Sequence, residues 1–155
     1  MPVDWQALQN FTFIDPGPLR DGDLELLLNQ TCPAIVEKGW VPEYKFHMIR
    51  PGTKVVMGSI QLRVVLTEKL KELGGHIGYE VYSPYRGQHY AARACRLLFP
   101  LLRRLAMNPV VITCDPQNTP SVKTIESLGG QIMHTKVVEI EPGIQRWTSV
   151  YHLNV

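Results

Sequence analysis

The stretch Gly75–Ala94 constrains the fold more than any other part of the chain. In its first half Ile77, Tyr79 and Val81 alternate with polar or small residues, which is the period of a half-buried strand. Pro84 ends this pattern because proline has no N–H to donate to a strand ladder. Beyond the proline, apolar residues fall on one helical stripe: Ala91, Ala94, Leu98, Leu101, Leu102 and Leu105. The sequence therefore predicts a strand, a tight turn and a helix.

The turn before this helix has the composition of an anion-binding site. Arg86 supplies a positive charge, and Gly87 permits a tight backbone. The first N–H groups of a helix have no partner within it, and they carry the positive end of the helix dipole. A phosphate group would be stabilised at this position.

The composition is that of a single globular domain, which we expect to span residues 1–155. Hydrophobic residues make up 45% of the chain and charged residues 19%, and the formal net charge is only +2. So small a charge gives no reason to expect nucleic acid or a membrane surface as partner. No apolar run approaches the ~20 residues of a transmembrane helix.

The cysteines and the N-terminus indicate the cellular compartment in which the protein works. Cys32, Cys95 and Cys114 are odd in number and lack metal-ligand spacing, so we expect buried thiols in a reducing compartment and no metal site. The first ten residues lack the basic start and apolar core of a signal peptide. The expected location is the cytoplasm.

The first half of the chain is expected to supply three strands and one helix. Phe11–Ile14 is interpreted as a strand, and a helix capped by Asp21 is expected to contain Leu24–Leu28. Two apolar-rich runs around a Pro-Gly turn, Tyr44–Ile49 and Val55–Leu66, predict a hairpin. A charged connector that contains one helical turn at Glu68–Glu72 then leads into the central strand.

The second half is expected to end in strands. In the central helix Pro100 predicts a kink or an early end. The later elements are a buried strand at Val110–Cys114, a helix capped by Thr119 and ended by Gly129–Gly130, and strands at Ile132–Ile140 and Trp147–Leu153. The order β-α-β-β-β-α-β-α-β-β predicts an α/β layered domain with a mixed central sheet of about six to seven strands flanked by helices.

The turn sequence PYRGQHYA resembles the Arg/Gln-x-x-Gly-x-Gly/Ala motif of the GNAT N-acetyltransferase superfamily. Arg86 and Ala91 match the ends of the motif, whereas His89 stands where the family has its central glycine. Val110–Gly130 is similar to the family's strand-Asn-helix segment, with Asn118 at the asparagine position. The motifs Gly58–Arg63, Gly74–Tyr79 and Ile112–Asp115 are similar to those of a poorly characterised bacterial subgroup. The element order agrees, and the resemblance runs from about Phe11 to the end.

The resemblance implies acetyl-coenzyme A as co-substrate, with its pyrophosphate on the amides of the turn. It implies that the pantetheine arm pairs with the central strand and that an N–H near Val81 stabilises the oxyanion. His89 could crowd the phosphate, donate a hydrogen bond to it, or lie on the surface without a role. The implied coenzyme-binding residues are Val81, Tyr82, Arg86, Gly87, Gln88, His89, Tyr90, Ala91 and Asn118.

The catalytic groups are less well determined by the sequence. Many family members place a glutamate where this chain has Thr113, and a tyrosine where it has Ile125. Glu80 is the candidate general base, acting directly or through a water, with a solvated or ion-paired glutamate as the alternative. His76 is a second candidate for the same role. Cys114 is interpreted as a buried structural thiol rather than a nucleophile.

The function implied is N-acetylation of an amine by direct attack on acetyl-coenzyme A. The acceptor, a small molecule or a peptide, is not readable from the sequence, and a homodimer is possible. The missing glutamate and tyrosine support one alternative, a non-catalytic acyl-coenzyme A-binding or regulatory module on the same fold.

Overall fold

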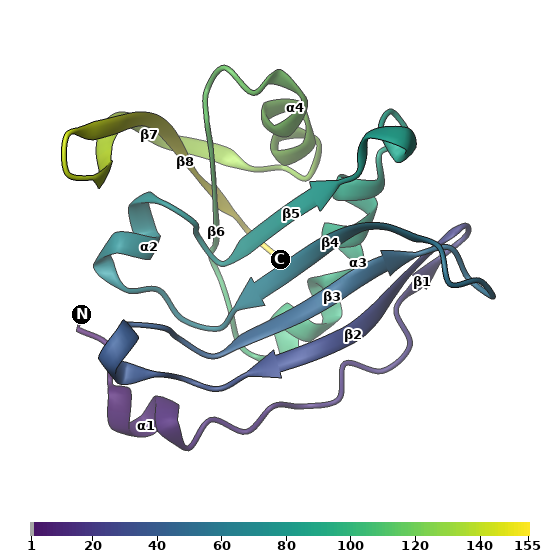
Figure 1. Cartoon of the computed structure of the whole chain (residues 1–155), viewed down its shortest axis with the longest axis horizontal. Helices are drawn as coiled ribbons and strands as arrows, with labels where there is room; N and C mark the ends of the chain where they lie inside the picture. Colours follow the sequence, from purple (N-terminus) through teal and green to yellow (C-terminus); the bar gives the residue numbers. More distant parts are fainter. Residues whose placement is uncertain (1) are drawn as a thin grey trace.

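The computed structural model describes residues 2–155, and within them the chain forms eight strands and four α-helices (Figure 1). In chain order the elements are α1 Trp5–Gln9, β1 Arg20–Asp21, β2 Leu24–Cys32, the 3-10 turn η1 Val36–Lys38, β3 Glu43–Ile49, β4 Val56–Arg63, α2 Glu68–Glu72, β5 Ile77–Val81, the 3-10 turn η2 Ser83–Tyr85, α3 Tyr90–Arg104, β6 Val110–Cys114, α4 Thr119–Ser127, β7 Gln131–Glu141 and β8 Ile144–Leu153.

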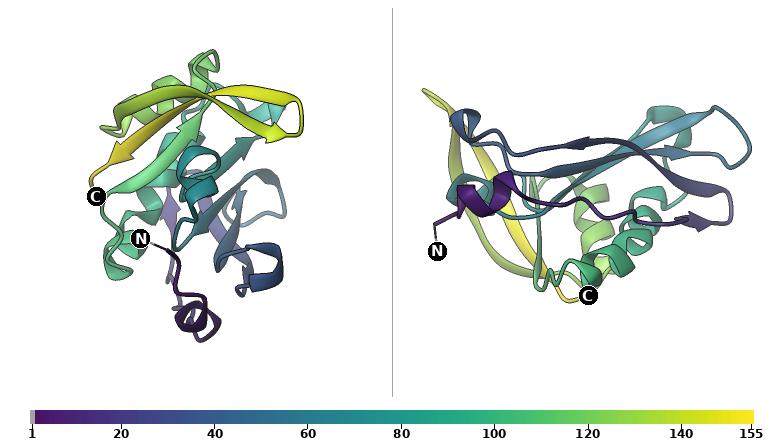
Figure 2. Two further views of the ribbon diagram at one scale, coloured as in Figure 1. Left: turned by 90° about the vertical axis from the view of Figure 1, so that its left-hand side faces the viewer. Right: turned by 90° about the horizontal axis from the view of Figure 1, so that it is seen from below.

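The predicted α/β class is confirmed. The strands form two antiparallel sheets and not the one mixed sheet of about six to seven strands that was predicted, because β5 and β6 share no ladder. Strands β1-β2-β3-β4-β5 form an antiparallel sheet in that order, and β6-β8-β7 form a second one. Figure 2 shows α3 and α4 on the same side of the five-stranded sheet. The opposite side of that sheet faces the viewer in Figure 1, and no helix crosses it there.

The core lies between the five-stranded sheet and α3. Phe46 and Leu62 of the sheet and Leu98 and Leu101 of the helix are almost completely buried. Burial of side chains of this size stabilises a fold by about 1.5–3 kcal/mol each relative to exposure. The helix therefore has a fixed position behind β5, and its first turn has a fixed position at the end of that strand.

The first predicted strand is wrong. Phe11–Ile14 is an extended segment outside both sheets, and its aromatic side chains pack on Tyr44. The ring centroids of Phe13 and Tyr44 are 5.0 Å apart, and the N–H of Ile14 donates to the Tyr44 hydroxyl at 3.0 Å. Apolar packing, rather than a strand ladder, explains the apolar run in the sequence.

The helix predicted after Asp21 is also wrong, because Leu24–Cys32 forms β2. Leu24 and Leu26 are buried and Leu27 is 51% exposed, which is the period of a strand. A leucine-rich run favours a helix by intrinsic propensity, but pairing with β3 from Glu25 to Cys32 overrides that preference. Asp21 caps no helix and instead binds Arg93 of α3.

Two details of the later helices differ from expectation. α3 continues through Pro100 to Arg104, since the buried leucine stripe on either side holds the helix against the sheet. Asn118, rather than Thr119, caps α4: its Oδ1 accepts the N–H of Ser121 at 3.3 Å. The strand at Val110–Cys114 has the predicted bounds.

Candidate active site

Strands β5 and β6 begin side by side and then diverge (Figure 1). At their starts the N–H of His76 donates to the carbonyl of Val111 at 2.8 Å, and the N–H of Val111 donates to Nδ1 of His76 at 2.9 Å. Gly75 permits this approach, because a Cβ there would lie 2.6 Å from the Val111 carbonyl oxygen. Beyond this point β5 and β6 share no ladder, so the two sheets separate as a V.

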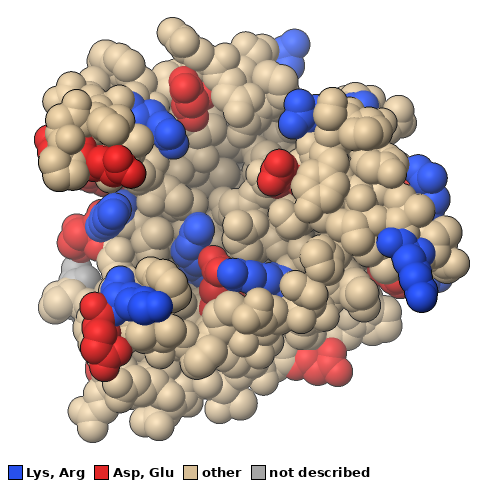
Figure 3. All heavy atoms as spheres, in the orientation of Figure 1, with Lys and Arg blue, Asp and Glu red and all other residues tan. Residues whose placement is uncertain are grey.

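The V opens into a cleft of about 1230 Å³ that is lined by β5, β6, α4, β8 and the turn before α3. Figure 3 shows a hollow on the face seen in Figure 1, with acidic and basic side chains at its margin. The cleft is large enough for an extended ligand, since small-molecule sites are typically 300–1,000 Å³.

One wall of the cleft is a strand edge without a partner strand. The N–H of Tyr82 donates to Met57 of β4, so backbone alternation directs the polar groups of Tyr79 and Val81 away from β4, toward β6. Because no ladder joins β5 to β6, these groups face the cleft instead of another strand. The Val81 carbonyl accepts Nε of Arg86 at 2.9 Å. The remaining groups are positioned to pair with amides of a bound chain.

The turn at the end of this edge presents a row of backbone N–H groups. The first helical hydrogen bond of α3 runs from Arg93 N–H to the His89 carbonyl, at 3.0 Å. Within residues 2–155 the N–H groups of 87–92 have no hydrogen-bond acceptor in the protein. Gly87 and His89 have φ values of 87° and 60°, and left-handed residues in a turn gather such N–H groups into an anion-binding concavity.

His89 adopts a backbone conformation that favours glycine. Its φ of 60° and ψ of 24° place it in the left-handed region, at the N-cap position of α3. The side chain is exposed and makes no hydrogen bond to residues 2–155. A glycine here, as in the family motif, would relieve backbone strain as well as let a phosphate approach the backbone closely. The motif alone indicates only the second effect.

Two aspartates of the β1–β2 turn hold the first turn of α3 in place. Arg93 contacts Asp21 and Asp23 at 2.8 Å each, and the hydroxyl of Tyr90 donates to Asp23. This hydrogen bond raises the pKa of Tyr90, and the same bond together with Arg93 lowers the pKa of Asp23. These contacts fix the first turn of α3 against the end of β1 and the start of β2.

The structure brings most of the predicted site residues together. Two of them, Tyr82 and Gln88, are exposed and are not part of the cleft wall. The predicted residues that do line it are Glu80, Val81, Arg86, Gly87, His89, Tyr90, Ala91 and Asn118. The carboxylate of Glu80 is exposed, and no ion pair within residues 2–155 involves it.

Sequence reasoning missed a hydroxyl pair across the cleft. The hydroxyl of Tyr79 on β5 and Oγ of Ser121 on α4 are 2.7 Å apart, and both line the cleft. Burial raises the pKa of Tyr79, so its hydroxyl stays protonated. Tyr79 shares the apolar face of the strand with Ile77 and Val81, so its sequence pattern indicates packing in the core and not a polar contact. The only sequence signal for the pair was Ser121, one helical turn after Asn118.

His76, the second candidate base, and the two residues at the positions of the family's glutamate and tyrosine have structural roles. Thr113 Oγ1 accepts the N–H of Gly74 at 3.0 Å, and Ile125 is fully buried. His76 joins the sheets at the apex of the V, where burial, with smaller effects of His152 and Arg63, lowers its pKa to about 4. A base of such low pKa contributes little at neutral pH, so His76 is a poor candidate for proton abstraction.

Comparison with known proteins decides the family. The family model described as the acetyltransferase (GNAT) domain matches residues 4–131, which is most of the chain. The chain belongs to the GNAT acetyltransferase family. The N-acetyltransferase YnaD of Bacillus subtilis strain 168, itself uncharacterised, is 24% identical to this GNAT chain over 135 residues, covering 81% of this chain and 72% of YnaD.

Solved structures show the same fold. The ribosomal-protein-S5-alanine acetyltransferase of Vibrio fischeri matches 72% of this chain with a TM-score of 0.60 and 16% identity. The microcin C7 self-immunity acetyltransferase MccE, solved with acetyl-coenzyme A and AMP, matches 73% with a TM-score of 0.58 and 16% identity. This GNAT chain spans 61% of each of these proteins.

Two further properties follow from the structure. No helix within residues 2–155 is long and apolar enough to cross a membrane. The same residues contain no group of three or more histidines, cysteines or carboxylates that could hold a metal ion.

Proposed function

We propose that this protein is an N-acetyltransferase that transfers the acetyl group of acetyl-coenzyme A directly to an amine. The observation that carries the proposal is that a free strand edge and a turn of free N–H groups open into one cleft. The strand edge can pair with the amides of an extended arm, and the N–H groups of the turn can bind a pyrophosphate. Membership in the GNAT family supports acetyl transfer as the reaction.

In this proposal the coenzyme lies along β5 with its pyrophosphate on the N–H groups of 87–91. The amides of the pantetheine arm pair with the free groups of Val81 and Tyr79, in place of the missing ladder to β6. An N–H of this edge then stabilises the oxyanion of the tetrahedral intermediate. Asn118 shapes the other wall by capping α4.

Glu80 is proposed to take the proton of the attacking amine, directly or through a water. It lines the cleft one residue from the proposed coenzyme-binding edge at Val81, and its exposed carboxylate can meet an amine that arrives from solvent. The amine nitrogen forms the new C–N bond, and the C–S bond breaks. Direct attack is favoured over a covalent enzyme intermediate because burial raises the pKa of the Cys114 thiol, which disfavours the thiolate needed for attack.

The leaving sulfur is proposed to accept a hydrogen bond from the Tyr79 hydroxyl, with Ser121 orienting that hydroxyl. A phenol whose pKa is raised above its usual value does not give up its proton readily to a thiolate of lower pKa. Its role is therefore to stabilise the developing negative charge, and solvent supplies the proton that completes the thiol.

The test measures release of free coenzyme A thiol across a panel of amines, together with calorimetric titration of acetyl-coenzyme A. Glu80→Gln should slow turnover by about 10²–10⁴-fold while the coenzyme dissociation constant changes little. Arg103→Gln, an exposed charge change on the far half of α3, is the matched control and should leave both quantities unchanged. Tight coenzyme binding without turnover on any amine would instead support the non-catalytic binding module.

Of the three free cysteines only Cys95 is buried, whereas Cys32 and Cys114 are partly exposed, so the expectation of three buried thiols is wrong for these two. The free thiols support the further proposal that the protein works in a reducing compartment such as the cytoplasm.

A further inference from the structure

A second hollow, of about 590 Å³, adjoins the cleft beside the β7–β8 hairpin. One wall is the loop Asp115–Gln117, which leaves β6, and the other is the end of the hairpin, with Ile140, Ile144 and Arg146. Asp115 and Arg146 line both this hollow and the main cleft, so the two cavities meet at these side chains.

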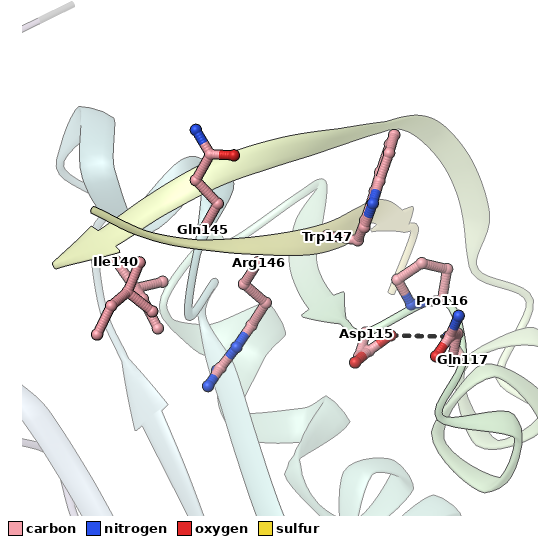
Figure 4. A pocket seen from close by; sticks show the side chains of 8 residues that line it. Asp115, Pro116, Gln117, Ile140, Gln145, Arg146 and Trp147 are labelled. Atoms are coloured by element: carbon pink, nitrogen blue, oxygen red, sulfur yellow. Dashed lines mark hydrogen bonds between the residues drawn. The ribbon is translucent and has the colours of Figure 1, made fainter. Parts of the chain in front are cut away.

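The two side chains at this junction carry opposite charges that the protein itself does not neutralise. No ion pair within residues 2–155 involves Asp115 or Arg146. The Asp115 carboxylate accepts the N–H of Gln117 with one oxygen at 2.8 Å, and this side chain makes no other hydrogen bond within residues 2–155. Figure 4 shows Arg146 leaving β8 on the side opposite to Gln145 and Trp147. The side chain of Arg146 makes no hydrogen bond within residues 2–155 and is exposed, so a ligand that enters from solvent can reach it.

We propose that this hollow binds the acceptor, and that the acceptor is an amine that also carries a carboxylate and an aliphatic body. The inference rests on the function proposed above and names its substrate class. The planar guanidinium of Arg146 is suited to bidentate recognition of a carboxylate. Asp115 attracts the ammonium form of the amine toward the cleft, and Ile140 and Ile144 pack against the aliphatic part.

This arrangement gives an order of events that keeps the charges balanced. The acceptor arrives as an ammonium carboxylate, held between Asp115 and Arg146. It loses one proton to water or Glu80, and the neutral amine attacks the thioester. The carboxylate takes no part in bond making and stays on Arg146 throughout. Its contribution is therefore binding and orientation of the acceptor.

The experiment compares leucine with isoamylamine, which is leucine without its carboxylate. Each is titrated into the protein saturated with coenzyme A, so that no turnover is required, and binding is measured by calorimetry. Leucine should bind about tenfold to a hundredfold more tightly than isoamylamine, the range of a charge-assisted hydrogen bond. Arg146→Gln should abolish the preference while leaving the affinity for isoamylamine unchanged, and the control Arg103→Gln should retain it.

Each outcome separates this inference from the proposed function. Equal affinities for the two amines, a preference that survives in Arg146→Gln, or no binding of leucine would overturn the inference while coenzyme binding remains. Failure of the protein to bind coenzyme A in the preceding titration would instead overturn the proposed function. Thermal unfolding of Arg146→Gln should match the wild type, because the side chain is exposed and contacts no ion partner in the described chain.

Discussion

Substitution of Gly75 by alanine should separate the two sheets at the apex of the cleft. Gly75 has a φ of 63°, and an added Cβ would lie 2.6 Å from the carbonyl oxygen and 3.1 Å from the carbonyl carbon of Val111. Ordinary contacts between non-bonded atoms are about 3.5–4.0 Å long, so the two backbones must move apart by about 1 Å. The obstacle is backbone on both sides, which cannot rotate away as a side chain can.

The cost can be estimated from what the movement breaks. An alanine in the left-handed region costs roughly 1–2 kcal/mol. Separation of the strands also weakens the two hydrogen bonds between His76 and Val111, each worth about 1 kcal/mol. Gly75→Ala should therefore destabilise the fold by about 3–4 kcal/mol, of which about 2 kcal/mol belongs to the contact between the sheets.

A matched control isolates that contact. Gly52 has a φ of 73° in the turn between β3 and β4, and a Cβ there would meet nothing within 4 Å. Gly52→Ala should consequently show only the backbone cost of about 1–2 kcal/mol. Urea unfolding of both variants measures the two free energies. If Gly75→Ala is no less stable than Gly52→Ala, the close contact at the apex of the cleft is not what holds the sheets together.

Two further predictions concern histidines. Burial lowers the pKa of His76 from 6.5 to about 4, so between these pH values the folded protein binds fewer protons than the unfolded chain. The contribution of His76 to the free energy of unfolding is therefore fully present above about pH 6.5 and is lost as the pH falls to about 4. Urea unfolding should show that the free energy of unfolding falls by about 3 kcal/mol over this pH range, and His76→Gln should lack this loss. An equal pH dependence in the two proteins would mean that other groups cause it. His89→Gly should raise the unfolding free energy by up to about 1 kcal/mol, since relief of the left-handed backbone exceeds the entropy cost of glycine, and should tighten coenzyme A binding at about pH 8 in a calorimetric titration. Weaker binding by this variant would mean that the imidazole contacts the phosphates.

The centre of the fold was predictable because local patterns and tertiary structure agree there. Ile77–Val81 alternates, α3 has one apolar stripe, and Val110–Cys114 is rich in β-branched residues, so each element follows from its own sequence. The region before β3 was not predictable. Leu24–Leu28 has the composition of a helix, and only its pairing with β3, a contact distant in sequence, makes it a strand.

The site was predictable where it depends on the backbone and not where it depends on side chains that meet across the cleft. The turn Arg86–Ala91 is continuous in sequence, so its place beside the cleft followed from the motif. Tyr79 and Ser121 are 42 residues apart, and their hydrogen bond depends on how α4 packs beside β5. The positive φ of His89 likewise comes from the geometry of the turn, which residue identity alone does not reveal.

The central claim, that the turn before α3 holds the coenzyme's phosphates, is tested most directly at Ala91. This residue lines the cleft in the first turn of the helix, where an aspartate is favourable to the helix dipole but repels a phosphate. Acetyl-coenzyme A is titrated calorimetrically into the wild type, Ala91→Asp and the uncharged control Ala91→Asn. We predict measurable binding to the wild type, binding at least about tenfold weaker for Ala91→Asp than for Ala91→Asn, and thermal unfolding of Ala91→Asp at no lower temperature than Ala91→Asn. Equal affinities of the Asp and Asn variants would place the phosphates elsewhere, and no binding to the wild type would contradict the account as a whole.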